Sequence, residues 1–337
     1  MKRVTMFRTA AGRRIYSLPL RAFPGLVANV YVISDGPRPL LVDCGSGLDE
    51  SNEDLLAGFT AIGNQYGETI HPADLGAILV THGHIDHFGG LAFLRQLTNA
   101  PIGVHPLDWR VLSHYEERVV VASRRLENFL EQAGVENTVR ANLMTMYLFA
   151  KGVYRSTPVQ FSLEEGEVEE LLAAGLSFYH MPGHCPGQVC IQVDDLLLTA
   201  DHVLAHTTPH QAPESITHNT GLGHYLASLA KIEQAPGVSL ALGGHEEPMP
   251  DLSGRIQAIR QAHHQRLERV LELCRQPQTI AEVSLALFGR VKSYHVLLGL
   301  EEAGAHIEYL YERGELVAAN VEEIEQKRNP VILYQRV

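Results

Sequence analysis

The sequence predicts an α/β protein in which two β-sheets form a sandwich between helices. Short apolar runs of strand length occur at 28–34, 39–45 and 75–82, and the first two are separated by the turn sequence DGPRP. Strand-like runs return at 175–181, 188–193, 195–200 and 238–245. Helical stretches alternate with these runs, and this order of elements is typical of a layered α/β domain.

Helical periodicity places the other elements of the chain. We expect helices at 49–62, 88–97 and 224–234, and a helical insertion at about 106–156. From residue 251 the order is helix (253–274), helix (279–288), helix (293–314) and two strands (315–319 and 330–336). The 337 residues suffice for two domains. We therefore expect a catalytic domain at 1–250 and a smaller domain at 251–337.

Composition and charge exclude several classes of protein. Hydrophobic residues make up 45% and charged residues 20%, which is ordinary for a globular protein that spans no membrane. The basic residues within the first twenty positions leave no apolar core for a secretory signal, so we expect a cytoplasmic protein. A formal net charge of −12 opposes binding to a phosphate backbone.

Four scattered cysteines lack the spacing of a disulfide framework or a zinc ribbon. We expect them to be reduced and to serve mainly in packing. They are Cys44, Cys185, Cys190 and Cys274.

The segment THGHIDHFGG at 81–90 carries the strongest chemical signal. It places His82, His84, Asp86 and His87 directly after a predicted apolar strand. Neutral imidazole binds zinc or iron, and a carboxylate adds an oxygen ligand and negative charge. Residues two apart on a loop can face one ion while the adjacent pair faces another, so this spacing indicates two metal ions.

These residues and four further motifs resemble the metallo-β-lactamase-fold hydrolase superfamily. The HxHxDH motif is followed by PGHCPGQ (182–188), LLLTADHVL (196–204) and LGGHEEP (242–248), and it is preceded by LLVDCGSG (40–47). The resemblance covers about residues 15–250. It implies the αββα sandwich of that superfamily, with a helical insertion.

The resemblance also implies a role for each motif residue. The first ion would be bound by His82, His84 and His184. The second would be bound by Asp86, His87 and His245. Asp201 would bridge the two ions, and Asp43 would orient the HxHxDH segment by hydrogen bonds. We expect two divalent ions, zinc in the first place, with iron or manganese as alternatives.

Such a pair of ions predicts hydrolysis without a serine or cysteine nucleophile. Cations lower the pKa of a shared water and polarise the oxygen of the scissile group. We expect a small ester, thioester or lactone substrate, as in the glyoxalase II branch, with Asp86 orienting the water or relaying a proton. Gln188 stands where many relatives have histidine, and no basic cluster for glutathione is evident, which argues against hydroxyacylglutathione.

Further histidines and a tyrosine follow the bridging aspartate. Of these, His206 and Tyr225 are our candidates for catalytic or pocket residues. His263 and His264 fall in a predicted helix, and we expect both to be solvated.

The region 251–337 resembles the winged-helix domain of lactamase-like hydrolases and endoribonucleases. A phosphodiesterase or endoribonuclease on the same metal centre is therefore an alternative function. A mononuclear iron sulfur dioxygenase and a non-catalytic binding protein are two others. The third helix of this region carries several glutamates, so we expect a packing module and no nucleic-acid partner. The expected partner is a small-molecule substrate, without a membrane, and a homodimer is the assembly to test.

Overall fold

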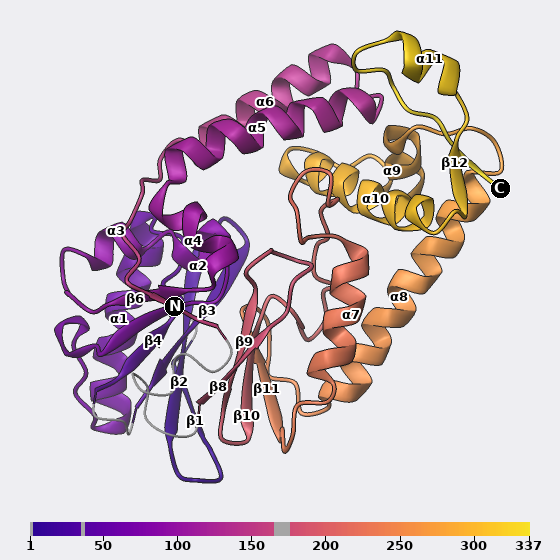
Figure 1. Ribbon diagram of the computed structural model, residues 1–337. Helices are drawn as coiled ribbons and strands as arrows, with labels where there is room; N and C mark the ends of the chain where they lie inside the picture. The colour runs from indigo at the N-terminus through magenta and orange to yellow at the C-terminus, as the bar shows by residue number, and fades with distance from the viewer. Residues whose placement is uncertain (1–2, 35–37, 165–175) are drawn as a thin grey trace. The chain divides into compact units, whose positions relative to one another are not determined.

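The computed structural model of the chain describes residues 3–34, 38–164 and 176–337 (Figure 1). These residues divide into two units. The first consists of Met1–Tyr115, Arg155–Pro209 and Ser228–Ile256. The second consists of Glu116–Tyr154, His210–Ala227 and Gln257–Val337.

The first sheet of the first unit has seven strands, paired in their order along the chain. Neighbouring strands are antiparallel from β1 to β4 and parallel from β4 to β7. The strands are β1 (Thr5–Arg8), β2 (Arg14–Phe23), β3 (Leu26–Ile33), β4 (Leu40–Val42), β5 (Ala77–Val80), β6 (Ile102–Val104) and β7 (Phe161–Ser162). The predictions of β3, β4 and β5 are confirmed, whereas the other four strands had not been predicted.

The second sheet has four described strands in the order β11, β10, β9, β8. They are β8 (Leu176–His180), β9 (Val189–Val193), β10 (Leu196–Ala200) and β11 (Leu240–Gly243), all of them predicted. Residue 175, at the start of the first predicted run, lies outside the described residues. Apolar side chains of both sheets form one buried core, for example Val42 and Leu79 with Ile191 and Leu198. The α/β sandwich is thereby confirmed.

Helix α1 (Asp49–Tyr66) packs on the first sheet at β2. Successive β2 side chains point to opposite faces, so Ile15 enters the core between the sheets while Tyr16 faces the helix. The Tyr16 and Tyr66 rings lie 5.3 Å apart between centroids. The predicted end of this helix at residue 62 was one turn short.

The expectation of one helix at 88–97 was wrong. Two single-turn helices, α2 (Ile85–Phe88) and α3 (Leu91–Leu94), stand there instead, and Gly89 and Gly90 separate them. Asp86 and His87 therefore lie on α2, and only His82 and His84 lie on the loop before it. A 3-10 turn, η1 (Pro72–Asp74), and helix α4 (Pro106–Ser113) complete the helices before residue 115.

One edge of the sandwich collects the ends of the strands that carry the motifs. Strands β4, β5 and β6 are parallel, and β8, β10 and β11 also run in one direction because β9 is antiparallel to both β8 and β10. Asp43 follows β4, His82 follows β5, His184 follows β8, Asp201 follows β10 and His245 follows β11. The carboxyl ends of strands in α/β folds are the usual place for ligand sites.

The second unit is mainly helical around its own buried core. Leu130 and Leu143 from the insertion pack there with Val270, Leu300 and Leu310 from the C-terminal region. Its elements are α5 (Tyr115–Gln132), α6 (Asn137–Lys151), α7 (Leu222–Ile232), α8 (Leu252–Leu273), α9 (Ile280–Phe288), α10 (Tyr294–Glu312), β12 (Leu316–Ala318), α11 (Val321–Gln326) and β13 (Tyr334–Arg336). Helices α5, α7 and α8 each have residues in both units.

Helices α8, α9 and α10 and the β12–β13 pair match the predicted order of elements, but helix α11 between the two strands had not been predicted. The assignment to the winged-helix class stays a prediction. So does the boundary at residue 250. None of the helices in the described part of the chain is long and apolar enough to cross a membrane.

Candidate metal centre

Three of the motif histidines are oriented by a polar contact at Nδ1. His87 Nδ1 lies 2.8 Å from Asp43 Oδ2, and His245 Nδ1 donates to the carbonyl of Val27 at 2.7 Å. His82 Nδ1 lies 3.0 Å from the hydroxyl of Thr81. Each ring therefore keeps Nε2 available toward the strand-end edge. Metal-binding histidines are commonly oriented in this way, by a hydrogen bond from the other ring nitrogen.

The second predicted ligand set converges at one point. Ligand atoms of Asp86, His87 and His245 all lie within 4.8 Å of one another. His245 Nε2 is 3.4 Å from Asp86 Oδ2, and His87 Nε2 is 4.0 Å from the same oxygen. Tetrahedral zinc with nitrogen and oxygen ligands near 2 Å holds them about 3.3 Å apart, so a cation fits among these atoms.

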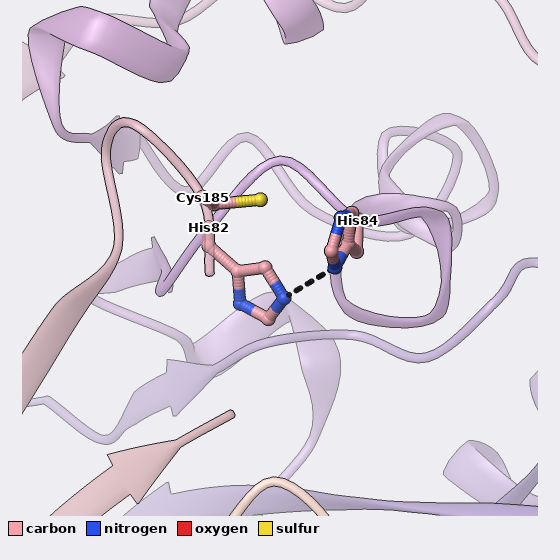
Figure 2. A group of neighbouring side chains, drawn as sticks. All are labelled: His82, His84 and Cys185. Atoms are coloured by element: carbon pink, nitrogen blue, oxygen red, sulfur yellow. Dashed lines mark hydrogen bonds between the residues drawn. The ribbon is translucent and has the colours of Figure 1, made fainter. Parts of the chain in front are cut away.

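The first predicted ligand set gathers beside the second. His82 Nε2 lies 3.2 Å from His84 Nδ1, and a dashed line marks this contact in Figure 2. The His184 ring centroid is 4.5 Å from that of His84 and 5.2 Å from that of His82. Ligand atoms of His82, His184 and Asp201 also fall within 4.8 Å of one another. The structure thus brings together the three histidines expected at the first ion.

Asp201 lies between the two sets. Its Oδ1 is 3.5 Å from His87 Nε2, while its Oδ2 is 3.3 Å from His245 Nε2 and 3.8 Å from His184 Nε2. One carboxylate therefore faces ligands of both predicted ions, as expected of a bridging group.

The backbone around Asp201 is tightly constrained. Ala200 has a φ of 46°, in the left-handed region that residues other than glycine rarely adopt. At Gly244, a Cβ would lie 2.4 Å from Asp201 Oδ1 and 2.7 Å from His87 Cε1. Glycine at position 244 therefore leaves room for the two ligands.

Asp43 supports the HxHxDH segment from the end of β4. Its Oδ1 accepts a hydrogen bond from the Thr81 amide at 2.8 Å, and its Oδ2 accepts one from the Thr81 hydroxyl at 2.8 Å and faces His87. Asp43 is almost fully buried and has a φ of 62°. Its predicted orienting role fits these contacts. The part played by Thr81 had been missed, because nothing distinguishes that residue except its place before the motif.

The charges of the site favour ionised carboxylates. Burial alone would raise the pKa of Asp201, but His245 and His87 outweigh it and hold this pKa well below its usual range. Asp86 shows the same balance, with its pKa lowered mainly by His87 and His245. Burial lowers the pKa of His82 well below its ordinary value, which keeps that imidazole in the neutral form that binds metals.

His87 and His245 carry the opposite shift. Burial opposes their charged forms, but the neighbouring carboxylates, Asp201 first, prevail, so the pKa of His87 is raised and that of His245 reaches about 10. Positive charge is therefore stabilised at this position between carboxylates, which is the electrostatic requirement for a cation.

Orphaned polar atoms give a direct test of whether a metal fits. His87 Nε2 and Asp201 Oδ1 are both buried, and neither has a hydrogen-bond partner among the described residues. Buried polar atoms are rarely left without a partner, because desolvation without a hydrogen bond is costly. Two such atoms 3.5 Å apart, on residue types that ligate zinc, fit a pair of ligands for one ion.

Cys185 also lies next to the first ligand set. Its ligand atom lies within 4.8 Å of those of His82 and His84, and Figure 2 shows the three side chains together. All four cysteines are buried and none forms a disulfide in the structure, and their reduced state stays a prediction. A packing role for Cys185 stays a prediction.

The structure does not place His206 with the seven ligand residues. Its side chain is 74% exposed, and its Nε2 lies 3.0 Å from Glu247 Oε2, at the surface. Tyr225 is fully buried, and its ring lies 5.5 Å from that of His263 within the second unit. These contacts give no support to a catalytic role for either residue, and the roles remain predictions.

The expectation that His263 is solvated was wrong, whereas His264 is exposed as expected. His263 is fully buried, with Nδ1 at 3.1 Å from His306 Nε2. The period of a helix shows which residues share a face, but it does not show that α10 covers the face that carries His263.

A sandwich that gathers five imidazoles and two carboxylates at one edge of its strands is typical of metal-dependent hydrolases. The chain belongs to the metallo-β-lactamase superfamily, whose family model matches residues 23–245. It is accordingly a metal-dependent hydrolase of that superfamily.

Several curated relatives are named as thioesterases, among them the following two. An atrochrysone carboxyl ACP thioesterase of Aspergillus fumigatus is 23% identical over 278 residues, which cover 78% of this chain and 69% of that protein. An acyl-coenzyme A thioesterase of Gallus gallus is 29% identical over 166 residues, covering 49% and 52% respectively. The chain thus spans about half of the second relative.

Solved structures match over almost the whole chain. A metallo-β-lactamase family protein from Thermus thermophilus has a TM-score of 0.76 at 27% identity, covering 96% of this chain and 98% of that one. A β-lactamase domain protein from Burkholderia ambifaria has a TM-score of 0.73 at 24% identity, with 98% and 93% covered. This second likeness shows the shared fold alone.

Proposed function

We propose that this chain is a dinuclear, metal-dependent hydrolase of small thioesters. The observation that carries the proposal is the position of Asp201, whose carboxylate faces ligands of both sets at 3.3–3.8 Å. A site for one ion would need only one of these sets. Complete triads on both sides of a shared carboxylate support two ions.

The donor set favours zinc as the native metal. Five imidazoles and two carboxylates make a mixed nitrogen and oxygen site of the kind that zinc and iron occupy, with manganese a weaker competitor for imidazole. Their summed charge is −2 when the imidazoles are neutral, which offsets half the charge of two divalent ions.

The residues of the site divide the work of hydrolysis. When bound, the ions would lower the pKa of a water and polarise the thioester carbonyl. Asp86 presents a carboxylate, kept ionised by its histidine neighbours, that can accept a proton from the attacking water. Asp43 and Thr81 fix the orientations of the His87 and His82 rings, so that the ligands need little reorganisation during the reaction.

Two relatives narrow the substrate class from esters, thioesters and lactones to thioesters. They are named for thioesters of coenzyme A and of an acyl carrier protein. The site itself needs only an activated carbonyl, so esters and lactones serve as comparison substrates. The net charge of −12 argues against the endoribonuclease alternative.

The test combines metal analysis with a substrate panel. Protein purified without added metal is analysed for zinc, iron and manganese by mass spectrometry, and then assayed with acyl-coenzyme A thioesters, aryl esters and lactones. We expect two zinc ions per chain and the highest kcat/KM on a thioester. One iron with oxygen consumption would instead establish the dioxygenase alternative, and a zinc-loaded protein inactive on every thioester would refute the proposal.

We also propose a cytoplasmic, homodimeric enzyme. The support for the location is four cysteines without a disulfide, as is usual in reducing compartments. For the dimer, the C-terminal region 251–337 is the candidate contact between the two copies, and sedimentation velocity on the full chain tests the assembly directly.

A further inference from the structure

Asp108 lies behind the first ligand set, at the third position of α4. It is fully buried, and its Oδ2 accepts a hydrogen bond from the Gly83 amide at 2.8 Å. Gly83 is the residue between His82 and His84. A buried carboxyl oxygen therefore holds one of the two peptide units that join these histidines.

The same side chain touches the loop that carries His184. A Cβ on Gly187 would lie 2.7 Å from Asp108 Cγ and 2.9 Å from its Cβ and its backbone nitrogen. Gly187 therefore lets the 182–188 loop rest directly on Asp108. One residue contacts both segments that supply histidines to the first ion.

The start of α4 is itself fixed to the 182–188 loop. His105, the N-cap residue of α4, stacks on His180 with ring centroids 3.8 Å apart and planes 13° from parallel. His180 Nε2 donates to the carbonyl of Pro186 at 2.7 Å. Asp108 is thus held on a short helix whose first residue is anchored to the same loop.

We propose that Asp108 is a positioning residue that sets the spacing of the three histidines of the first ion. Asp43 contacts His87 of the second set directly, and it reaches His82 of the first set through Thr81. Of these two buried aspartates, Asp108 contacts the segments of the first set, whereas Asp43 supports both sets. This inference rests on the proposed dinuclear function and adds a residue to it.

The positioning role of Asp108 leads to a prediction that differs between the two ions. Shifts of a fraction of an ångström in supporting groups weaken metal binding by about 10-fold to 100-fold. Asp108→Ala should therefore lower the affinity of the first ion by that factor and leave the second within about threefold. Asp43→Ala should weaken the binding of both ions, because Asp43 contacts His87 directly and His82 through Thr81.

Two further variants separate positioning from general loss of stability. Asp108→Asn keeps an oxygen that accepts from the Gly83 amide, so it should retain the affinity of the first ion within about threefold. Gly187→Ala should reproduce the loss seen in Asp108→Ala, because its methyl group displaces the same side chain from the other side. Asp54→Ala is the control: Asp54 is 4% exposed and accepts from the Arg21 amide at 3.0 Å, among residues of β2 and α1.

The measurement is stepwise zinc titration of the full chain against a competing chelator, together with the spectrum of the cobalt-substituted protein. The proposal predicts loss of one binding step and a changed cobalt spectrum in Asp108→Ala and Gly187→Ala, with both intact in Asp54→Ala. Wild-type affinity for both ions in Asp108→Ala, or equal weakening of both, would overturn it. A protein that loads two ions but cleaves no thioester would refute the proposed substrate and leave this inference standing.

Discussion

Replacing Asp201 by asparagine tests the bridging role with the smallest change of shape. The side chain keeps its size and one oxygen, but the second oxygen becomes an amide nitrogen, which cannot ligate a cation. Oδ1 faces His87 while Oδ2 faces His184 and His245, so whichever oxygen becomes the amide nitrogen, the second ligand set loses an oxygen that faces it. The carboxylate charge of the site falls from −2 to −1.

The size of the effect follows from the ligands that remain. Loss of a group that merely orients a ligand weakens metal binding by about 10-fold to 100-fold, so loss of a ligand and of one charge should cost at least about 100-fold for one ion. That factor corresponds to about 2.7 kcal/mol. Since hydrolysis in the proposed mechanism needs both ions, kcat/KM should fall by at least the same factor at limiting zinc.

The assay is zinc titration with chelator competition, followed by kcat/KM on the best thioester at fixed free zinc. Asp195→Asn serves as a matched control, since Asp195 stands just before the opposite end of β10 and bonds to the Ala10 amide and to Ser239. Its zinc affinity should equal that of the unmodified chain. If Asp201→Asn bound two ions at full affinity and kept its turnover within threefold, the bridging assignment would be refuted.

Three other predictions concern Gly244, the metal requirement, and His210, whose Nε2 lies 3.0 Å from Glu301 Oε2. Gly244→Ala should destabilise the chain by about 1–3 kcal/mol and reduce zinc uptake, because its methyl group would overlap Asp201 and His87; chemical denaturation and metal analysis measure the two effects. Removal of metal by a chelator should abolish hydrolysis, and zinc should restore it; activity that persisted in metal-free protein would contradict the mechanism. His210→Gln should be most destabilising below about pH 6.5 and progressively less so up to pH 9. Burial lowers the pKa of His210, but Glu301 and Glu302 raise it more strongly, to about 9 in the folded chain. Urea midpoints of both proteins across this range measure the effect, and a difference in midpoint that did not change with pH would disprove the linkage.

Local patterns in the sequence were enough to predict the ligand sets and most of the sandwich. The four ligands of the HxHxDH motif lie within six consecutive residues after an apolar strand, so the short chain between them keeps them close. They are His82, His84, Asp86 and His87. His184, Asp201 and His245 needed the resemblance to a known family, because spacing along the chain does not show that the ends of β8, β10 and β11 meet the end of β5. The structure brings them there.

Features that depend on long-range packing could not be predicted. Strands β6 and β7 have three and two residues, too few for periodicity, and they exist because neighbouring strands pair with them. Asp108 lies 25 positions from Gly83, and its importance is evident only when α4 is placed. His263 looked exposed because its burial partner, His306, lies 43 positions further along the chain.

The distribution of the ligands over the two sheets links metal binding to the mechanical integrity of the sandwich. Four ligands follow β5 of the first sheet and three follow strands of the second, so a cation bound by ligands from both groups would cross-link the two sheets. Separating the sheets would then require breaking coordinate bonds as well as exposing the apolar core. The loaded enzyme should therefore open far more slowly than the metal-free chain, and its lifetime in a cell would follow the local supply of metal.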